Sequence, residues 1–389
     1  MSAVIEFDVD PRFDSHFRRL RQVFLYINDQ CNLACKQCIY KPHVTYHEDR
    51  EISTARVGGL LNEMRRLGAE KLTILGGEPT LYGRGSDNSL ADVIAHAREI
   101  GFTYLRMDTN GLFPPALYEK ESLAELDEIA FSLDGYDSRT NDKLRGLGTF
   151  PKITKQIREA VARGIRASIT CCIHDDLVRP DADGVTGVER VIRLGEELGV
   201  TTVNFHDLFK AGVPMDTWTG EFNTRVEDHV AMYDGLKPKI DRGEFDVKVR
   251  LPQCFVTKDE FANNPEYYGY CPVKMGERVM IHSDGVIRIC SNLICSSFGT
   301  GYFTGNRIGW NETESNELLH HDMGEYTPCT NRSKNKKYGE FVPLCFSFKP
   351  DQDEPSWNAQ EWDGRRRVDL GATIPIAEHL QREPFVSVG

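Results

Sequence analysis

This sequence lacks several features that would mark a membrane, secreted or nucleic-acid-binding protein. No run approaches the roughly 18 consecutive apolar residues of a membrane-spanning helix. Residues 1–14 are acidic and polar, without the basic-then-apolar pattern of a secretory signal, which predicts a cytoplasmic protein. Basic residues are fewer than acidic ones: the chain has 47 Lys and Arg and 59 Asp and Glu, which gives a net charge of −12. We therefore expect no membrane and no nucleic acid among the partners.

A disulfide framework is also not expected, because the 11 cysteines are odd in number and the 389-residue chain is not a small secreted one. In a reducing compartment, clustered cysteines more often bind metal or perform chemistry. Three cysteines lie in the eight-residue segment Cys31-Asn-Leu-Ala-Cys35-Lys-Gln-Cys38. Six more fall in the last third of the chain, namely Cys254, Cys271, Cys290, Cys295, Cys329 and Cys345.

Short apolar runs alternate with helical patterns in the first half of the chain, which is typical of a parallel α/β sheet. Possible caps such as Ser53 and Ser89, and stop signals such as Gly68 and Gly101, mark the helices. The predicted strands are 23–28, 71–75, 104–107, 128–133, 167–173 and 201–205. The predicted helices are 53–68, 89–101, 150–164 and 188–199. Six such units predict a partial (β/α)6 barrel rather than the full barrel of eight.

Composition divides the chain into five segments. We predict an N-terminal extension over 1–22, the partial barrel over 23–210 and a connecting helical region over 211–250. A smaller, β-rich domain containing cysteines is predicted over 251–348, followed by a polar tail over 349–389. Ligands bind at the carboxyl ends of strands in parallel sheets. The chain places its unusual motifs at those ends, which predicts one composite site.

The first cysteine group carries the strongest signal in the sequence. Three thiolates on one loop can converge on an iron–sulfur cluster, and four-iron clusters normally have four cysteine ligands. Cys31, Cys35 and Cys38 would therefore leave one iron without a protein ligand. A zinc site that recruits His43 or His47 as its fourth ligand is the alternative.

The Cys-x3-Cys-x2-Cys loop after the first strand resembles that of the radical SAM superfamily. Gly76-Gly77-Glu78-Pro79, Thr109-Asn110-Gly111, Ser132-Leu133-Asp134-Gly135 and Leu144-Arg145-Gly146 are similar to further motifs of that family, over about residues 22–210. The resemblance implies a [4Fe–4S] cluster on the three cysteines, AdoMet as cofactor, and an electron donor such as flavodoxin or ferredoxin. The implied AdoMet-binding residues are Gly76, Gly77, Glu78, Asp108, Asn110, Ser132, Asp134, Arg145 and Leu208. Gln37 departs from the family, which usually has an aromatic residue before the third cysteine.

The second cysteine group is similar to the start of the auxiliary-cluster domain of SPASM and twitch members. The resemblance implies one auxiliary [4Fe–4S] cluster on Cys271, Cys290, Cys329 and Cys345, with Cys254 and Cys295 as competing ligands. The dense cysteine run that would hold a second auxiliary cluster is absent from the sequence. A structural zinc site and buried free thiols remain as alternatives.

Three residues near the ends of the fifth and sixth strands are candidate catalytic groups. His174 and His206 could exchange protons near neutral pH, although packing histidines are the commoner case. Cys171 and Cys172 are adjacent in one strand, so alternation sends only one of them towards the cavity. We take Cys171 as the candidate.

The resemblance implies an enzyme that reductively cleaves AdoMet to a 5′-deoxyadenosyl radical, which then abstracts hydrogen from a substrate. We expect oxidation (dehydrogenation) or rearrangement of a small natural-product intermediate such as an amino sugar or cyclitol. Peptide crosslinking is the alternative. A molybdopterin-precursor cyclase is a weaker candidate, because we see no basic residues of the kind expected to line its substrate site. A non-enzymatic iron–sulfur carrier or zinc-binding module would leave Glu78, Asn110, Ser132 and Arg145 unexplained.

Overall fold

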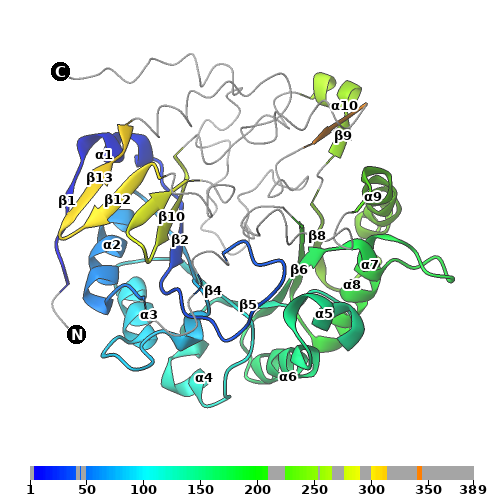
Figure 1. Ribbon diagram of the computed structural model, residues 1–389, viewed down its shortest axis with the longest axis horizontal. Coiled ribbons are helices and arrows are strands. Elements are labelled where there is room, and N and C mark those ends of the chain that lie inside the picture. Colours follow the sequence, from blue (N-terminus) through cyan, green and yellow to red (C-terminus); the bar gives the residue numbers. More distant parts are fainter. Residues whose placement is uncertain are drawn as a thin grey trace.

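The computed structural model describes residues 4–40, 44, 50–208, 224–252, 255–264, 276–289, 299–312 and 340–343 (Figure 1). The strands are β1 (Asp8–Val9), β2 (Gln22–Tyr26), β3 (Lys71–Leu75), β4 (Tyr104–Thr109), β5 (Glu128–Ser132), β6 (Ala167–Ile173), β7 (Thr202–Asp207), β8 (Lys248–Arg250), β9 (Phe255–Thr257), β10 (Arg278–His282), β11 (Val286–Arg288), β12 (Gly301–Thr304), β13 (Arg307–Trp310) and β14 (Phe341–Pro343). The helices are α1 (Pro11–Phe17), α2 (Thr54–Arg66), α3 (Leu90–Glu99), α4 (Leu117–Lys120), α5 (Ser138–Arg145), α6 (Thr149–Ala162), α7 (Asp175–Val178), α8 (Gly187–Leu198), α9 (Val226–Asp241) and α10 (Lys258–Asn263), with 3₁₀ turns η1 (Pro79–Leu81) and η2 (Leu123–Glu125).

The predicted parallel sheet is confirmed. The six predicted strands correspond to β2 through β7, which pair in chain order and in parallel. β8 extends the same parallel array beyond β7. Helices α2, α3, α4, α6 and α8 lie along the outside of this curved array (Figure 1). The carboxyl ends of the strands therefore share one rim, as a partial barrel requires.

Local sequence explains where the helices begin and end. The hydroxyl oxygen of Ser89 accepts a hydrogen bond from the Asp92 amide at 3.1 Å and caps α3. Asp137 forms a reciprocal capping box with Thr140 at the start of α5. Gly199, at a φ of 74°, ends α8 in a left-handed conformation that favours glycine.

The two faces of the parallel strands differ in polarity. On β3 and β4, Leu72, Ile74, Leu105 and Met107 alternate with more polar residues and belong to the buried core. These apolar side chains share the core with residues of α2 and α3. The intervening side chains face the inside of the curved sheet, where any ligand of the barrel would lie.

The sheet also extends beyond β2, in a way that the sequence analysis missed. β10 pairs in parallel with β2, and β11, β12 and β13 follow in antiparallel order. β1, from the predicted N-terminal extension, then pairs with β13. Phe13 and Phe17 of α1 are fully buried in the core, so residues 11–17 pack as part of the fold. The segment boundaries predicted above remain predictions.

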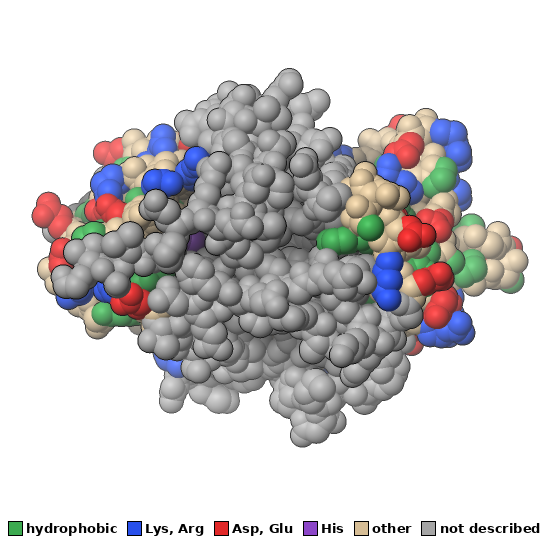
Figure 2. Space-filling model, turned by 90° about the horizontal axis from the view of Figure 1, so that it is seen from above, with side chains coloured by type: hydrophobic (Ala, Val, Ile, Leu, Met, Phe, Trp, Pro, Cys, Tyr) green, Lys and Arg blue, Asp and Glu red, His purple; other side chains and the backbone are tan. Residues whose placement is uncertain are grey.

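Most of the predicted auxiliary domain cannot be compared with the structure. The cysteines at 254, 271, 290, 295, 329 and 345 lie outside the described residues, as do 349–389. In the part of the chain that is described, no helix has both the length and the apolar character needed to cross a membrane. Acidic and basic side chains are interspersed on both flanks of the described surface (Figure 2).

Candidate active site at the carboxyl ends of the strands

The cysteine loop follows β2 and lies at the rim of the sheet. Cys31, Cys35 and Cys38 form no disulfide among the described residues and are partly exposed. Burial and the nearby Glu78 carboxylate raise the pKa of the Cys31 thiol to about 12. Burial also raises the pKa of Cys35, although the charge of Arg145 opposes that rise. Bare thiolates are therefore disfavoured in this loop.

Two neighbouring side chains direct N–H groups at these sulfurs. Asn110 Nδ2 lies 3.9 Å from Cys31 Sγ, and Arg145 Nη1 lies 4.0 Å from Cys35 Sγ. Asn110 is held in place because its Nδ2 also donates to Asn32 Oδ1 at 2.7 Å. Donors of this kind stabilise thiolate ligands and tune the metal that they hold.

The loop fits a metal cluster better than it fits free thiolates. Metal binding removes the thiol protons and adds positive charge to that of Arg145. Cys31, Cys35 and Cys38 also interact electrostatically, so one cationic group between them would relieve their mutual repulsion. The arrangement is chemically suited to an iron–sulfur cluster with three thiolate ligands.

The Gly76–Gly77 turn packs directly against the start of this loop. Gly77 N donates to the Asn28 carbonyl at 2.8 Å, and Glu78 N donates to the Gln30 carbonyl at 2.7 Å. A Cβ atom at Gly77 would overlap the Gln30 carbonyl oxygen, so a side chain cannot be accommodated there. The glycines thus position the cysteine loop as well as ending β3.

The Glu78 carboxylate, one of the implied AdoMet-binding groups, is surrounded by donors from the protein itself. Glu78 is 1% exposed. Its Oε1 accepts from Thr80 and from the Thr109 hydroxyl at 2.7 Å, and its Oε2 accepts from Asn110 N at 2.7 Å. The carboxylate therefore joins the ends of β3 and β4 and holds the Asn110 segment in place.

Asp134 organises the opposite side of the site. Its Oδ2 pairs with Arg145 Nε at 2.6 Å and accepts from Gln37 Nε2 at 2.6 Å. Its Oδ1 accepts from Cys172 N at 2.7 Å. Asp134 is fully buried. Gln37, the departure from the family pattern, therefore helps to hold the carboxylate that orients Arg145.

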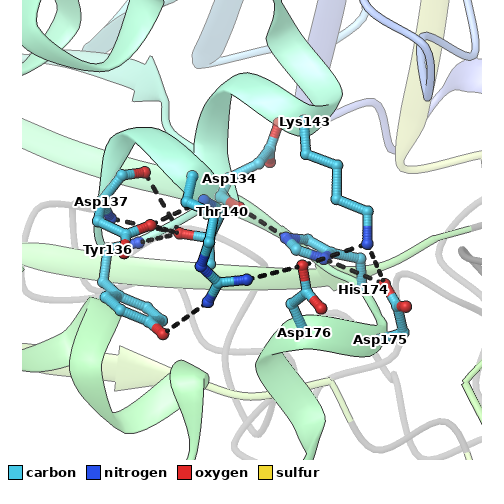
Figure 3. A network of polar contacts seen from close by, with 9 residues as sticks. Asp134, Tyr136, Asp137, Thr140, Lys143, His174, Asp175 and Asp176 are labelled. Carbon is cyan, nitrogen blue, oxygen red and sulfur yellow. Dashed lines mark hydrogen bonds and ion pairs between the residues drawn. The ribbon is translucent and has the colours of Figure 1, made fainter.

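His174 belongs to the same network of polar contacts (Figure 3). Its Nε2 donates to the Asp134 carbonyl at 2.9 Å, and its Nδ1 lies 3.5 Å from Asp175 Oδ1. Asp175 and Asp176 both pair with the Lys143 amine, at 2.9 and 3.2 Å. His174, Asp175 and Asp176 are close enough to hold an ion, but Lys143 already supplies the positive charge there.

The two adjacent cysteines of β6 have different surroundings. Cys171, the predicted candidate, is fully buried within the hydrophobic core. Cys172 is partly exposed and its side chain interacts with Asp134. Burial and the Asp134 charge raise the pKa of Cys172 well above its usual value. Strand alternation thus brings Cys172 to the site in place of Cys171.

The remaining predicted residues lie on the same rim, at the ends of β4, β5 and β7. Asp108 pairs with Arg106 at 2.6 Å. Ser132 is partly exposed at the end of β5, and Leu208 is partly exposed just after β7. His206 Nε2 lies 2.9 Å from Asn204 Nδ2 on β7. The structure therefore brings the predicted first-half residues to one rim, except Cys171.

Below this rim the inner face of the sheet is charged, which the sequence analysis did not foresee. Arg106 pairs with Glu128 at 3.1 Å. Lys71 lies 4.7 Å from the centre of the Tyr104 ring and interacts electrostatically with Arg250 of β8. A signal was present in the sequence, because β3 and β4 alternate polar and apolar residues where a sheet buried on both faces would be apolar throughout.

Comparisons with known proteins agree with this site. A profile described as the Radical SAM superfamily matches residues 25–178. A GTP 3′,8-cyclase of Psychromonas ingrahamii is 30% identical over 154 residues, 40% of this chain and 43% of the relative. The mycofactocin maturase MftC of Mycobacterium ulcerans is 26% identical over 216 residues, 54% of this chain and 53% of the relative. This chain thus spans about half the length of these two relatives.

Among solved structures, Streptococcus suis SuiB bound to its precursor peptide SuiA has a TM-score of 0.56 and 16% identity, covering 79% of this chain and 66% of that one. That likeness shows the fold. The profile match, the fold and the cysteine loop place residues 25–178 in the radical SAM superfamily, and the relatives named here are enzymes. The cofactors of this superfamily are the [4Fe–4S] cluster and AdoMet, and SuiB has also been solved with S-adenosylmethionine.

Proposed function

We propose that the chain is a radical AdoMet enzyme that reductively cleaves AdoMet and abstracts a hydrogen atom from a small polar substrate. The observation that carries this proposal is the convergence of Cys31, Cys35 and Cys38 with Asn110 and Arg145 at one rim. When bound there, a [4Fe–4S] cluster with one open iron supplies the electron that breaks the C–S bond of AdoMet and yields the 5′-deoxyadenosyl radical. The protein holds, orients and shields the reactants.

Named residues supply these roles in the proposal. The thiolates of the cysteine loop hold the cluster, with Asn110 and Arg145 donating towards two of the sulfurs. Glu78 and Asp134 position those two donors. The proposed AdoMet contacts are Gly76, Gly77, Glu78, Asp108, Asn110, Ser132, Asp134, Arg145 and Leu208. For Glu78 we favour an indirect role through Asn110, because its carboxylate oxygens already have protein donors.

The charged inner face supports a small polar substrate. Five side chains lie inside the curved sheet: the Lys71 amine, whose pKa burial lowers well below its usual value, the guanidinium groups of Arg106 and Arg250, and the carboxylates of Asp108 and Glu128. Such a lining offers hydrogen bonds and charge to a polyhydroxylated or ionic molecule, and little to an apolar one. An amino sugar or cyclitol belongs to this class. An oxidative reaction additionally requires the auxiliary cluster proposed on Cys271, Cys290, Cys329 and Cys345.

A nucleotide is the second candidate substrate. Two observations favour it: the guanidinium groups of Arg106 and Arg250 on the inner face, and the similarity to a GTP 3′,8-cyclase. Arg106 already pairs with the carboxylates of Asp108 and Glu128. A peptide substrate is supported by the names of MftC and SuiB. The substrate experiment below therefore includes peptides as the competing outcome.

The first experiment combines iron analysis with product analysis under anaerobic conditions. Reconstituted wild-type protein, reduced with dithionite, should form 5′-deoxyadenosine from AdoMet. The variant C31A/C35A/C38A should form none. An iron–sulfur carrier or a zinc module would form none in either case, which would refute the proposal. If the triple variant keeps about four irons per chain, an auxiliary cluster exists; if it keeps none, the oxidative reaction loses its support.

Candidate substrates can be ranked by adding each to the wild-type assay. A true substrate should accelerate 5′-deoxyadenosine formation and, when deuterated at the reactive carbon, should transfer deuterium into it. GTP, amino sugars, cyclitols and short peptides are the panel. Acceleration by peptides alone would overturn the small-molecule proposal while leaving the AdoMet chemistry intact.

A further inference from the structure

A buried carboxylate joins the two ends of the cysteine loop. Asp29 lies two residues before Cys31, and Tyr40 lies two residues after Cys38. The Tyr40 hydroxyl donates to Asp29 Oδ1 at 2.7 Å, and both side chains are buried. This hydrogen bond therefore closes residues 29–40 into a ring of chain that contains all three cysteines of the loop.

The same carboxylate also binds two other segments of the chain. The Ser283 hydroxyl, from the turn between β10 and β11, donates to Asp29 Oδ1, and Arg50 Nε pairs with Asp29 Oδ2 at 3.1 Å. Ser283 belongs to the segment 251–348, in which we predict the auxiliary cluster. We call Asp29, Tyr40 and Ser283 the Asp29 clasp. It connects the cysteine loop to a hairpin that lies 254 residues further along the chain.

Aromatic rings reinforce this connection. The Tyr40 ring lies 4.7 Å from the ring of Tyr26 on β2, measured between centroids. The Tyr26 ring stacks on His282, the residue before Ser283, at 4.3 Å and an interplanar angle of 9°. Strand β10 also pairs in parallel with β2, directly beside it in Figure 1. The hairpin thus contacts the loop through ring packing as well as through the clasp.

The beginning and the middle of the loop are held by the barrel. The Gln30 carbonyl accepts from Glu78 N at 2.7 Å, and Lys36 N donates to the Leu144 carbonyl at 2.9 Å. The end of the loop is held at Tyr40, through a hydrogen bond to a carboxylate. Two residues of chain span at most about 7 Å, so the place of Cys38 follows that of Tyr40.

We propose that Asp29 is a positioning residue for the iron–sulfur cluster. Through Tyr40 it keeps the end of the cysteine loop closed on the iron, and through Ser283 it makes retention of that cluster depend on the β10–β11 hairpin. A chelator can take iron only after a thiolate has moved away, which requires the loop to open. Ligands held in their binding arrangement open less often. This inference rests on the proposed function, because it needs a cluster on the loop.

The floor of the barrel offers a matched control. Glu128 is also a buried carboxylate that accepts from one tyrosine and one serine, Tyr104 and Ser168, and pairs with one arginine, Arg106. It begins β5, whereas the cysteine loop follows the carboxyl end of β2. Changes at Tyr104 and Ser168 therefore remove the same chemical groups at the opposite end of the parallel strands.

The test measures how fast a ferrous chelator removes iron from the full-length, iron-loaded protein under anaerobic conditions. The variants Y40F and S283A are compared with Y104F and S168A. Each change is also made in the C31A/C35A/C38A background, which records any iron held elsewhere and allows it to be subtracted. The unfolding temperature of each variant is recorded, so that a general loss of stability is recognised.

We expect Y40F to release the iron of the loop about tenfold faster than wild type, the factor that fits the loss of one hydrogen bond to a charged group. S283A should release it about threefold faster, because the Tyr40 bond remains. Y104F and S168A should stay within twofold of wild type, even where they lower the unfolding temperature. Equal release from Y40F and Y104F would overturn the proposal, and equal release from S283A and S168A would overturn the role of the hairpin.

Failure of the proposed function looks different, because wild type would then hold no iron on the loop and form no 5′-deoxyadenosine. Hydrogen exchange of the amides of residues 31–38 in the iron-free, full-length protein tests the clasp in that case. Exchange should be about tenfold faster in Y40F and unchanged in Y104F. The same exchange rate in both variants would show that Asp29 does not hold the loop.

Discussion

Two buried charge networks in this molecule have opposite characters. At the floor of the barrel, the Glu128 carboxylate accepts hydrogen bonds from Tyr104 and Ser168 and pairs with Arg106. At the rim, Asp134 pairs with Arg145 Nε, and Arg145 Nη1 lies 4.0 Å from Cys35 Sγ. The charges of the floor network pair with one another, whereas the rim network ends at the Cys35 sulfur. The comparison teaches that buried charge alone does not mark the reactive centre, which lies where a network leads to a reactive group.

The largest expected effect is on the stability of the fold, and it comes from the floor network around Glu128. Burial would raise the pKa of Glu128, but Arg106, Lys71 and its hydrogen-bond donors lower it to about 2. Glu128→Gln leaves Arg106 with the Asp108 carboxylate alone and removes the charge beside Lys71, so we expect a loss of about 3–5 kcal/mol in the free energy of unfolding. Urea denaturation measures this loss.

Glu125→Gln is the control, because Glu125 is exposed and its loss should cost under about 0.5 kcal/mol. Folded, iron-loaded E128Q should still cleave AdoMet in the presence of dithionite. If a folded E128Q variant has lost AdoMet cleavage, the separation of a stabilising floor network from a functional rim network is wrong.

The second-largest expected effect is on AdoMet cleavage, and it comes from the rim network around Asp134. Asp134→Asn keeps the shape but removes the charge that holds Arg145 at 2.6 Å. We expect dithionite-driven formation of 5′-deoxyadenosine to fall about 10- to 100-fold, as for other residues that orient metal ligands. Asp127→Asn is the control, since Asp127 pairs with Arg98 in a partly exposed position away from the thiols. Equal rates for the two variants would contradict the role given to Asp134.

A smaller effect should follow from Gln37→Leu. This change removes one donor from Asp134 Oδ2 and leaves the Arg145 pair. Losing a hydrogen bond to a charged group costs about 1.5 kcal/mol, so we expect the cleavage rate to fall about tenfold. Gln156→Leu is a matched control, because Gln156 is equally buried and donates one hydrogen bond, to the Phe113 carbonyl. If both variants cleave AdoMet equally, Gln37 has no part in the site.

The smallest expected effect is a pH dependence of the free energy of unfolding. It comes from the ion pair between Asp207 of β7 and His229 of α9. Burial lowers the pKa of His229, but the Asp207 charge and hydrogen bond outweigh it, so the net pKa is raised. The pair should therefore stabilise the fold fully below the ordinary histidine pKa of about 6.5, with that contribution lost as pH rises through the raised pKa. Unfolding free energies of wild type and His229→Gln, measured between pH 6 and pH 9, should converge at high pH. A constant difference would argue against this pair.

The parallel sheet, the helix caps and the cysteine loop were predictable from the sequence because they are local. Alternating strands and helices need only periodicity and turn residues. Thiols within eight residues of each other must be neighbours in any fold. The predicted strands 71–75 and 167–173 match β3 and β6. The resemblance to radical SAM enzymes rested on the same short-range motifs, and it holds for residues 25–178.

Only the tertiary structure decided which distant side chains meet. Gln37 and Asp134 lie 97 residues apart yet share a hydrogen bond. Lys71 and Arg250 interact across the curved sheet from β3 to β8. Alternation on β6 left open which of Cys171 and Cys172 faces inward, and burial of Cys171 in the core settled it. Such contacts depend on strand order, register and curvature, which arise from the packing of the whole sheet and which no local stretch of sequence encodes.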